Sequence, residues 1–132
     1  SQRPYQISAT SAAQKHKSDD QVHLQGPKAD IFLNTSGWMA INSNRGIYNR
    51  TNQVLDLSGD VTIFHDKGYE FRTKALKIDL LNGIGSSTTQ VNVRGLAGEI
   101  SSQGFTISRQ GTRVLFTGKS KAILRGSRRS NL

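Results

Sequence analysis

Apolar residues recur at every second position in short runs separated by glycine, and this alternation constrains the fold more than any other feature. It is clear in residues 60–63, 76–80, 91–95 and 105–108. Successive side chains of a β-strand point to opposite faces, so each run predicts a strand with one apolar and one polar face. Together the runs form a continuous apolar surface, which the chain must bury as a core or keep open for an apolar guest.

Strands separated by turn signals, without credible helices between them, predict an antiparallel all-β domain. Residues 5–9 alternate and predict a first strand, whereas residues 11–20 lack an apolar stripe and are expected to form a loop. Asn82-Gly83 is the strongest hairpin signal, because a type I′ turn needs a positive φ at both central residues. The other strands are predicted over residues 22–25, 28–34, 38–43, 46–50, 53–58, 60–66, 69–73, 75–81, 84–87, 90–94, 97–102, 105–109, 112–117 and 120–124.

A chain of 132 residues predicts a single domain, and an apolar share of 34% predicts a thin core. Glycine inside predicted strands, as at Gly85 and Gly98, indicates bends, bulges or close backbone approach. Unless the sheet closes into a barrel, its edges remain free to pair with another chain. The expected organisation is one domain over 1–132, with an edge strand and loop in 1–20, a β stack in 21–124 and a flexible basic tail in 125–132.

The net charge of +9 favours an anionic partner, which would be nucleic acid, a membrane surface or a phosphorylated amphiphile. Part of the charge is local, in Lys15, Lys17 and the C-terminal arginines. No cysteine is present, which neither supports nor excludes an oxidising compartment. The sequence contains no transmembrane segment and no signal peptide, but it begins at Ser1 without methionine, which leaves room for an upstream segment.

The sequence offers no catalytic constellation, so we expect neither an enzyme nor a cofactor. His16, His23 and His65 are scattered, and their spacing with the carboxylates predicts no metal site. The glycines are spread at turn spacing with no helix after them, which is unlike a phosphate-binding loop.

An ordered series of segments resembles the periplasmic domain of the LptC family, the lipopolysaccharide-export bridge proteins of Gram-negative bacteria, in its α-proteobacterial form. The series covers about residues 4–124, and its order is more specific than any one motif. Its segments are Tyr5-Gln6-Ile7-Ser8-Ala9, Val22-His23-Leu24, Lys28-Ala29-Asp30-Ile31, Gly37 to Gly46, Leu57-Ser58-Gly59-Asp60-Val61-Thr62-Ile63-Phe64, Gly68 to Thr73, Leu76 to Leu80, Gly98 to Phe105 and Phe116-Thr117-Gly118.

The resemblance implies an open-ended, twisted antiparallel β-jellyroll, or β-taco, in which two facing sheets enclose an apolar interior. It implies lipopolysaccharide as the ligand and a periplasmic location, with an N-terminal membrane helix that this chain does not contain. It also implies an inner-membrane ABC transporter as partner at the N-terminal end. A periplasmic bridge protein of similar fold is the partner implied at the C-terminal edge. The residues after Leu124 form no obvious part of the family pattern.

Alternation assigns a set of residues to the inner face, and the resemblance implies that as a group they contact acyl chains; a dry packed core is the alternative. They are Val61, Ile63, Phe71, Leu76, Ile78, Leu80, Ile84, Val91, Val93, Ile100, Phe105, Ile107, Val114 and Phe116. Partner edges are expected within residues 5–10 and 28–34 on the incoming side and 112–124 on the outgoing side. Their apolar members are Tyr5, Ile7, Ile31, Leu33, Leu115, Phe116 and Ile123.

Two other functions follow from other features. The positive charge suggests a nucleic-acid-binding β domain, but the basic residues are spread and not interleaved with aromatic residues on one face, which weighs against it. The glycine rhythm, and the similarity of residues 58–62 to residues 97–101, suggest a structural β-solenoid fragment, although two copies do not establish a repeat array.

Overall fold

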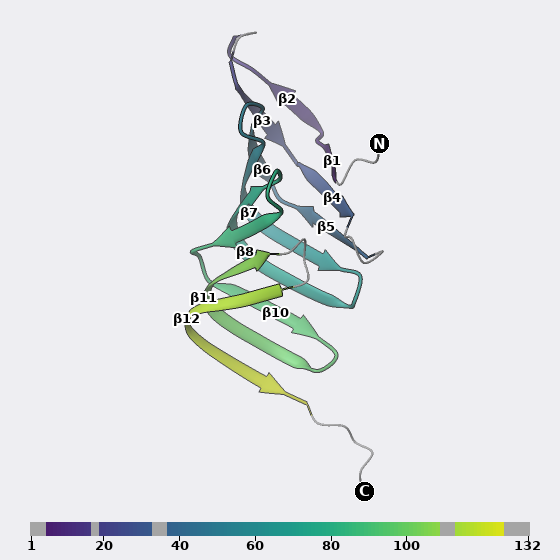
Figure 1. Ribbon diagram of the computed structural model, residues 1–132, viewed down its shortest axis with the longest axis vertical. Helices are drawn as coiled ribbons and strands as arrows, with labels where there is room; N and C mark the ends of the chain where they lie inside the picture. The colour runs from purple at the N-terminus through teal and green to yellow at the C-terminus, as the bar shows by residue number, and fades with distance from the viewer. Residues whose placement is uncertain (1–4, 17–18, 33–36, 109–112, 126–132) are drawn as a thin grey trace, which may run out of the picture.

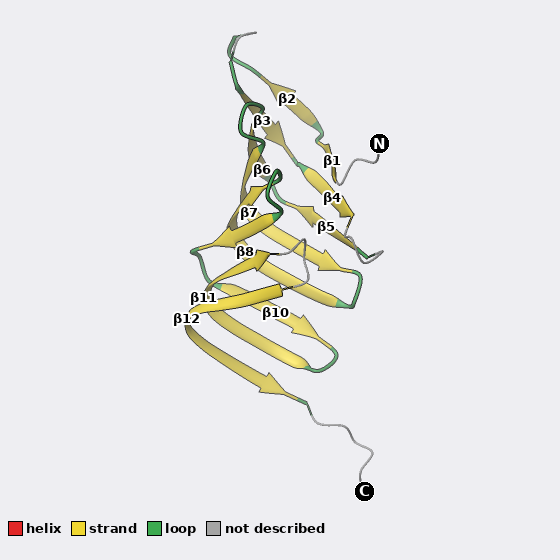
Figure 2. Cartoon of the chain, viewed as in Figure 1, coloured by secondary structure: helices red, strands yellow, loops and turns green. Residues whose placement is uncertain are grey.

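The computed structural model describes residues 5–16, 19–32, 37–108 and 113–125, and in this part of the chain all regular structure is β-strand (Figures 1 and 2). The strands stack along the long axis of the molecule, with β1 and β2 at one end and β12 at the other (Figure 1). They are β1 (Tyr5–Ser8), β2 (Ser11–Ala13), β3 (Gln21–Gln25), β4 (Lys28–Phe32), β5 (Trp38–Asn42), β6 (Arg45–Asn49), β7 (Val54–His65), β8 (Tyr69–Asp79), β9 (Ile84–Ser87), β10 (Val91–Gly95), β11 (Gly98–Ser108) and β12 (Arg113–Leu124).

All pairings are antiparallel and join the strands into one folded sheet with two halves, which we call leaf A and leaf B. Four long strands, β7, β8, β11 and β12, run through both leaves. Leaf A contains β1, β4, β5, β10 and residues 61–65, 69–73, 98–102 and 120–124 of the long strands. Leaf B contains β2, β3, β6, β9 and residues 54–58, 75–79, 104–108 and 113–117.

The fold line between the leaves passes through two β-bulges. In β7, Gly59 and Asp60 together oppose Lys74, and both have positive φ, +80° and +47°. In β12, Gly118 and Lys119 oppose Gln103, and the φ of Gly118 is +73°. A bulge bends its strand and increases the local twist, which turns each long strand from one leaf into the other.

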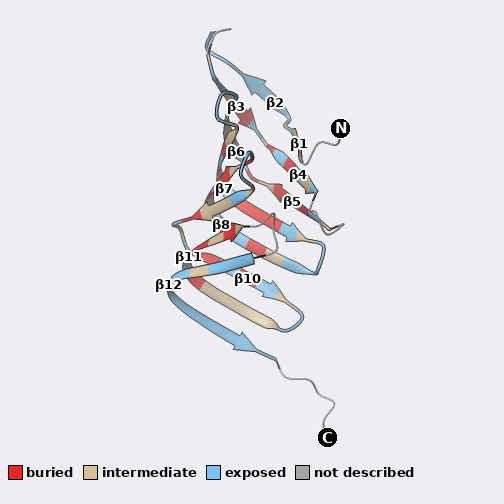
Figure 3. Cartoon of the chain, in the orientation of Figure 1, coloured by how far each residue is buried: buried red, intermediate tan, exposed pale blue. Residues whose placement is uncertain are grey.

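The core lies between the leaves and contains ten of the side chains predicted to face inward, together with six that were not assigned there: Leu24, Ala29, Met39, Ile41, Leu55 and Leu57. Phe71 from leaf A and Phe105 from leaf B are both buried, with ring centroids 5.6 Å apart. Segments of buried residues lie along the middle of the stack, while β12 is exposed over almost its whole length (Figure 3). The two leaves are therefore held together mainly by aliphatic and aromatic contacts across the interior.

The structure confirms the predicted all-β antiparallel sheet and corrects several of its details. The sequence predicts separate strands on either side of residues 59, 74, 103 and 118. In the structure each such pair is one long strand, because the pairing continues past the bulges. Ser11–Ala13 is a strand rather than a loop, since its backbone pairs with β3 and an exposed edge strand needs no apolar stripe. Residues 33–34, 109 and 112, which were assigned to strands, lie outside the described residues.

The hairpin predicted at Asn82-Gly83 forms, but not with a type I′ turn. Asp79 pairs with Ile84, so four residues form the loop. Gly83 has a φ of +70°, whereas Asn82 has no positive φ. Asn82 instead donates from its backbone N–H and its side-chain amide to the Asp79 carboxylate, at 3.0 and 2.8 Å. These two hydrogen bonds stabilise the four-residue loop that forms instead of the predicted two-residue turn.

Candidate apolar groove and strand edges

A cavity of about 110 Å³, the interior cavity, lies between the leaves. Among the described residues that line it, polar side chains come from Tyr5 and Asp79, and the rest of the lining is apolar or glycine. Leaf A contributes Tyr5, Ile31, Phe32, Met39, Ile41 and Ile63; leaf B and the 80–83 loop contribute Leu76, Ile78, Asp79, Leu80, Leu81, Gly83, Ile84, Gly85 and Ile107. An enclosure of this chemistry favours hydrocarbon over any polar ligand.

The interior cavity is smaller than the ~150 Å³ apolar cavity that accepts benzene. A whole acyl chain therefore fits only if the leaves separate or lining side chains move. The mouth of the cavity is already apolar and open to solvent, since Phe32, Leu81 and Ile84 line it and are 53%, 68% and 39% exposed. Trp38, the register partner of Phe32, is also exposed.

A second, wider hollow, the end hollow, lies at the end of the stack that carries β1 and β2. It is lined by Tyr5, Gln6, Ile7, Leu24, Phe32 and Tyr48, and its volume is about 580 Å³. Tyr5 and Phe32 line both spaces, so these two side chains stand between the end hollow and the interior cavity.

Tyr5 also makes a polar contact across the gap between the leaves. Its hydroxyl donates to Oε1 of Gln53 at 2.8 Å, and Gln53 belongs to the loop that joins β6 to β7 in leaf B. Burial raises the pKa of Tyr48 above its usual value of 10.0, and a hydrogen bond with Tyr5 and their charge interaction raise it further. The neutral form of Tyr48 is therefore favoured beside Tyr5.

Most residues assigned to lipid contact lie inside the fold. Those that are buried are Val61, Ile63, Phe71, Leu76, Ile78, Leu80, Val91, Val93, Phe105 and Ile107. Ile100 and Phe116 are partly buried, while Ile84 and Val114 are 39% and 36% exposed. Of the assigned residues, Ile63, Leu76, Ile78, Leu80, Ile84 and Ile107 line the interior cavity.

The other residues assigned to lipid contact do not line the interior cavity. Several residues that do line it were not assigned from the sequence. Phe32, Met39, Ile41 and Leu81 line the cavity without having been assigned to it. The alternation in 38–43 signals Met39 and Ile41, whereas nothing in the sequence signals Leu81, which lies in a loop.

The free edges of the sheet lie at its two ends. Among the described strands, β1, with Tyr5 and Ile7, pairs only with β4, and β2 pairs only with β3. In the same part of the chain β12, with Leu115, Phe116 and Ile123, pairs only with β11. The assignment of the described residues 28–32 to an edge is wrong, because β4 lies between β1 and β5, and Ile31 has register partners on both sides. Leu33 lies outside the described residues.

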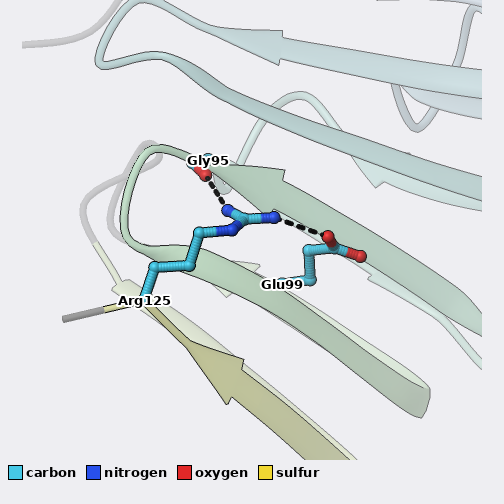
Figure 4. Close-up of polar contacts among 3 residues, drawn as sticks. All are labelled: Gly95, Glu99 and Arg125. Atoms are coloured by element: carbon cyan, nitrogen blue, oxygen red, sulfur yellow. Dashed lines mark hydrogen bonds and ion pairs between the residues drawn. The ribbon is translucent and has the colours of Figure 1, made fainter.

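Arg125 follows the last residue of β12 and forms polar contacts with the β10–β11 hairpin. Its guanidinium donates to the Glu99 carboxylate at 2.7 Å and to the Gly95 carbonyl oxygen at 3.5 Å (Figure 4). The rest of the predicted tail, 126–132, lies outside the described residues. Lys119 and Lys121 are exposed on β12, and lysine on an edge strand discourages unspecific pairing with other chains.

Within the described ranges, no three His, Cys, Asp or Glu side chains gather as a metal site would require. The same part of the chain contains no helix with the length and apolar character needed to cross a membrane.

Comparison with known proteins gives a family and a fold. The family model described as "Lipopolysaccharide-assembly, LptC-related" matches residues 2–125. Among solved structures, the chain is similar to LptH of Pseudomonas aeruginosa, described as the LptA-homologous periplasmic component of the conserved lipopolysaccharide transport device. The TM-score is 0.67 and the identity 9%, with 95% of this chain and 96% of that chain covered. At this identity the likeness shows the fold alone. No curated protein sequence gives a significant match.

Proposed function

The chain belongs to the LptC-related family of lipopolysaccharide-assembly proteins, and from this premise we propose that it passes lipopolysaccharide through the periplasm with the acyl chains held between its two leaves. The observation that carries the proposal is the interior cavity, which both leaves line with apolar side chains and whose mouth is also apolar. The known function of the family and the shape of the molecule thus point to the same ligand.

The energetics of lipid transfer require such a lining. An acyl chain of about a dozen methylenes costs roughly 10 kcal/mol to expose to water, at about 0.8 kcal/mol for each methylene. A carrier that shields the chain along the whole path removes most of this cost. The phosphorylated sugars stay outside, where the net charge of +9 attracts them and exposed Lys and Arg side chains can form charge-assisted hydrogen bonds.

The role proposed for this domain is passive. It binds the acyl chains weakly enough to release them, and the energy for transport comes from the inner-membrane ABC transporter, which we place at the β1 and β2 end. The next bridge protein would extend the sheet at β12, which has no described strand on its outer side to pair with its backbone N–H and C=O groups. Pairing of both halves of β12 would continue both leaves and hence the apolar interior.

Photo-crosslinking tests the lipid path. A photoreactive residue at Ile78 or Phe105, which are buried between the leaves, is expected to trap lipopolysaccharide in cells. The matched control is the same residue at Lys77, which neighbours Ile78 on β8 but is exposed on the opposite face. Crosslinks from Lys77 with none from Ile78 and Phe105 would contradict the proposed path.

The same method tests the outgoing edge. A photoreactive residue at Leu115, which is 57% exposed on β12, is expected to capture a protein of similar fold. Asn92 is the control, because it is exposed on β10 but that strand is paired on both sides. Equal capture from both positions would show that the contact is not made by the edge.

A further inference from the structure

Tyr5 makes a polar contact at the place where the end hollow and the interior cavity meet. Its side chain lines both spaces, and its hydroxyl reaches from leaf A to Gln53 beside leaf B. A chain that extends from the end hollow to Ile78 and Ile107 in the interior passes beside the side chains of Tyr5 and Phe32, which line both spaces.

The two partners of this contact differ in how firmly they are held. Gln53 is fixed by its backbone, since its N–H donates to the Asn49 carbonyl at 2.9 Å and its own carbonyl accepts from Leu80 N–H at 3.0 Å. Gln53 has a φ of +57°, a left-handed conformation that glutamine rarely adopts and that the surrounding structure must maintain. Such strain at a residue whose side chain holds another element suggests a positional role for it.

Tyr5, by contrast, lies on a strand that can move. β1 has four residues, pairs with β4 on one side only, and places alternate residues in solvent. Short edge strands with few buried contacts open more easily than central strands. The fixed Gln53 and the movable Tyr5 therefore form a latch in which only one side changes position.

We propose that Tyr5 is a gate: while it is bound to Gln53, chains stop in the end hollow, and when β1 swings outward they reach the interior cavity. This inference rests on the proposed function, because the gate acts on the acyl chains of the lipid that the groove carries. The gate makes binding depend on the length of the acyl chain, since a short acyl chain fits in the end hollow outside the gate and a long one does not.

The test holds the gate shut chemically. The chain has no cysteine, so Tyr5→Cys/Gln53→Cys can be bridged by a short bis-maleimide without side reactions. The probes are dansyl-labelled hexanoic and undecanoic acids, and circular dichroism checks the fold of each form. Bridging is expected to weaken binding of the long probe roughly tenfold or more, because its inner methylenes lose their contacts, and to leave the short probe within about twofold.

Two variants of the protein without the Cys substitutions test the opposite case, in which the contact that closes the gate is removed. Tyr5→Phe keeps the ring but removes the hydroxyl that bonds Gln53 and Tyr48, and it is expected to bind the long probe about two- to tenfold faster than the wild type. Tyr5→Ala removes the ring as well and should bind at least as fast. The single-cysteine variants, capped with a monofunctional maleimide, control for the bulk of the reagent.

The outcomes separate the gate from the function on which it rests. Unchanged long-probe binding in the bridged protein, or loss of both probes, overturns the gate. Absence of binding of either probe to any form, the wild type included, overturns the proposed function instead.

Discussion

Gly98 lies so close to Ile123 that a Cβ atom on Gly98 would stand 2.0 Å from the Ile123 carbonyl oxygen. Gly98 begins β11, has a φ of +145°, and is the register partner of Leu124 at the end of β12. The contact brings the backbone of the outermost strand against the β10–β11 hairpin, next to the site where Arg125 is bound. No side chain can replace the hydrogen of this glycine without moving β12.

Gly98→Ala is therefore expected to lower the free energy of unfolding by at least about 1–3 kcal/mol, the usual cost of an unfavourable backbone conformation. The matched control is Gly85→Ala, because the nearest atom to a Cβ there is Leu76 Cδ1 at an ordinary 3.8 Å. That change should stay within about 0.5 kcal/mol of the wild type. Urea denaturation of both variants measures the difference; equal effects would contradict the proposed steric cause.

Gly59 and Gly68 allow backbone strain to be separated from crowding. Their φ values are +80° and +90°, but a Cβ on Gly59 would lie 2.9 Å from Asn44 Cβ, whereas Gly68 has nothing within 4 Å. Gly68→Ala is expected to cost about 1–2 kcal/mol through the left-handed backbone alone. Gly59→Ala should cost more, because Asn44 is held by its N–H bond to the Gly59 carbonyl. Thermal unfolding measures both variants, and a larger decrease in Tm for Gly68→Ala than for Gly59→Ala would contradict this expectation.

Ser102 holds the bulge of β12 from inside. Its hydroxyl oxygen lies 2.9 Å from the Gly104 carbonyl oxygen, 2.8 Å from that of Thr117 and 2.8 Å from Ser120 Oγ. Because Ser102 is 3% exposed, Ser102→Ala leaves these groups without a buried partner and should destabilise the fold by about 1–3 kcal/mol. Ser101→Ala, which removes an exposed bond to Asn92, is the control with an expected effect below about 0.5 kcal/mol.

The pKa of Asp79 lies below its usual value of 3.8, chiefly because the Asn82 side chain and backbone donate to its carboxylate. Because the folded pKa is lowered, the stability that these bonds contribute is present above about pH 3.8 and is lost as the pH falls through the folded value. Asn82→Ala is expected to raise the pKa of Asp79 towards normal, as measured by NMR titration of its carboxyl carbon. Lys77→Ala, which removes the weakest of the causes, should move it less.

The sequence predicts the inner face of the fold better than it predicts the cavity. Val61, Ile63 and Phe71 are buried as alternation requires, because the alternation of a strand leaves its side chains only two directions. Val114 shares the predicted pattern and is nevertheless 36% exposed. It lies on β12, the last strand of the described sheet, and local alternation does not contain that information.

The position of Tyr5 illustrates the same limit. Alternation predicts a strand around it, but its place between two cavities depends on pairing with Ile31 and on the left-handed Gln53. Both are long-range features, and glutamine gives no local signal for a positive φ. Bulges are equally hard to predict, since Gly59 and Gly118 read as strand breaks in the sequence but lie inside continuous strands.

The four long strands that pass through both leaves also limit how the protein can deform. Leaves joined in this way do not separate like two independent plates, and any widening of the space between them must be absorbed by rotation at Gly59, Gly118 and their neighbours. β12 is one of these strands, so the angle between its two halves changes with the spacing of the leaves. A widening of the space between the leaves therefore also changes the shape of the edge that β12 presents to solvent.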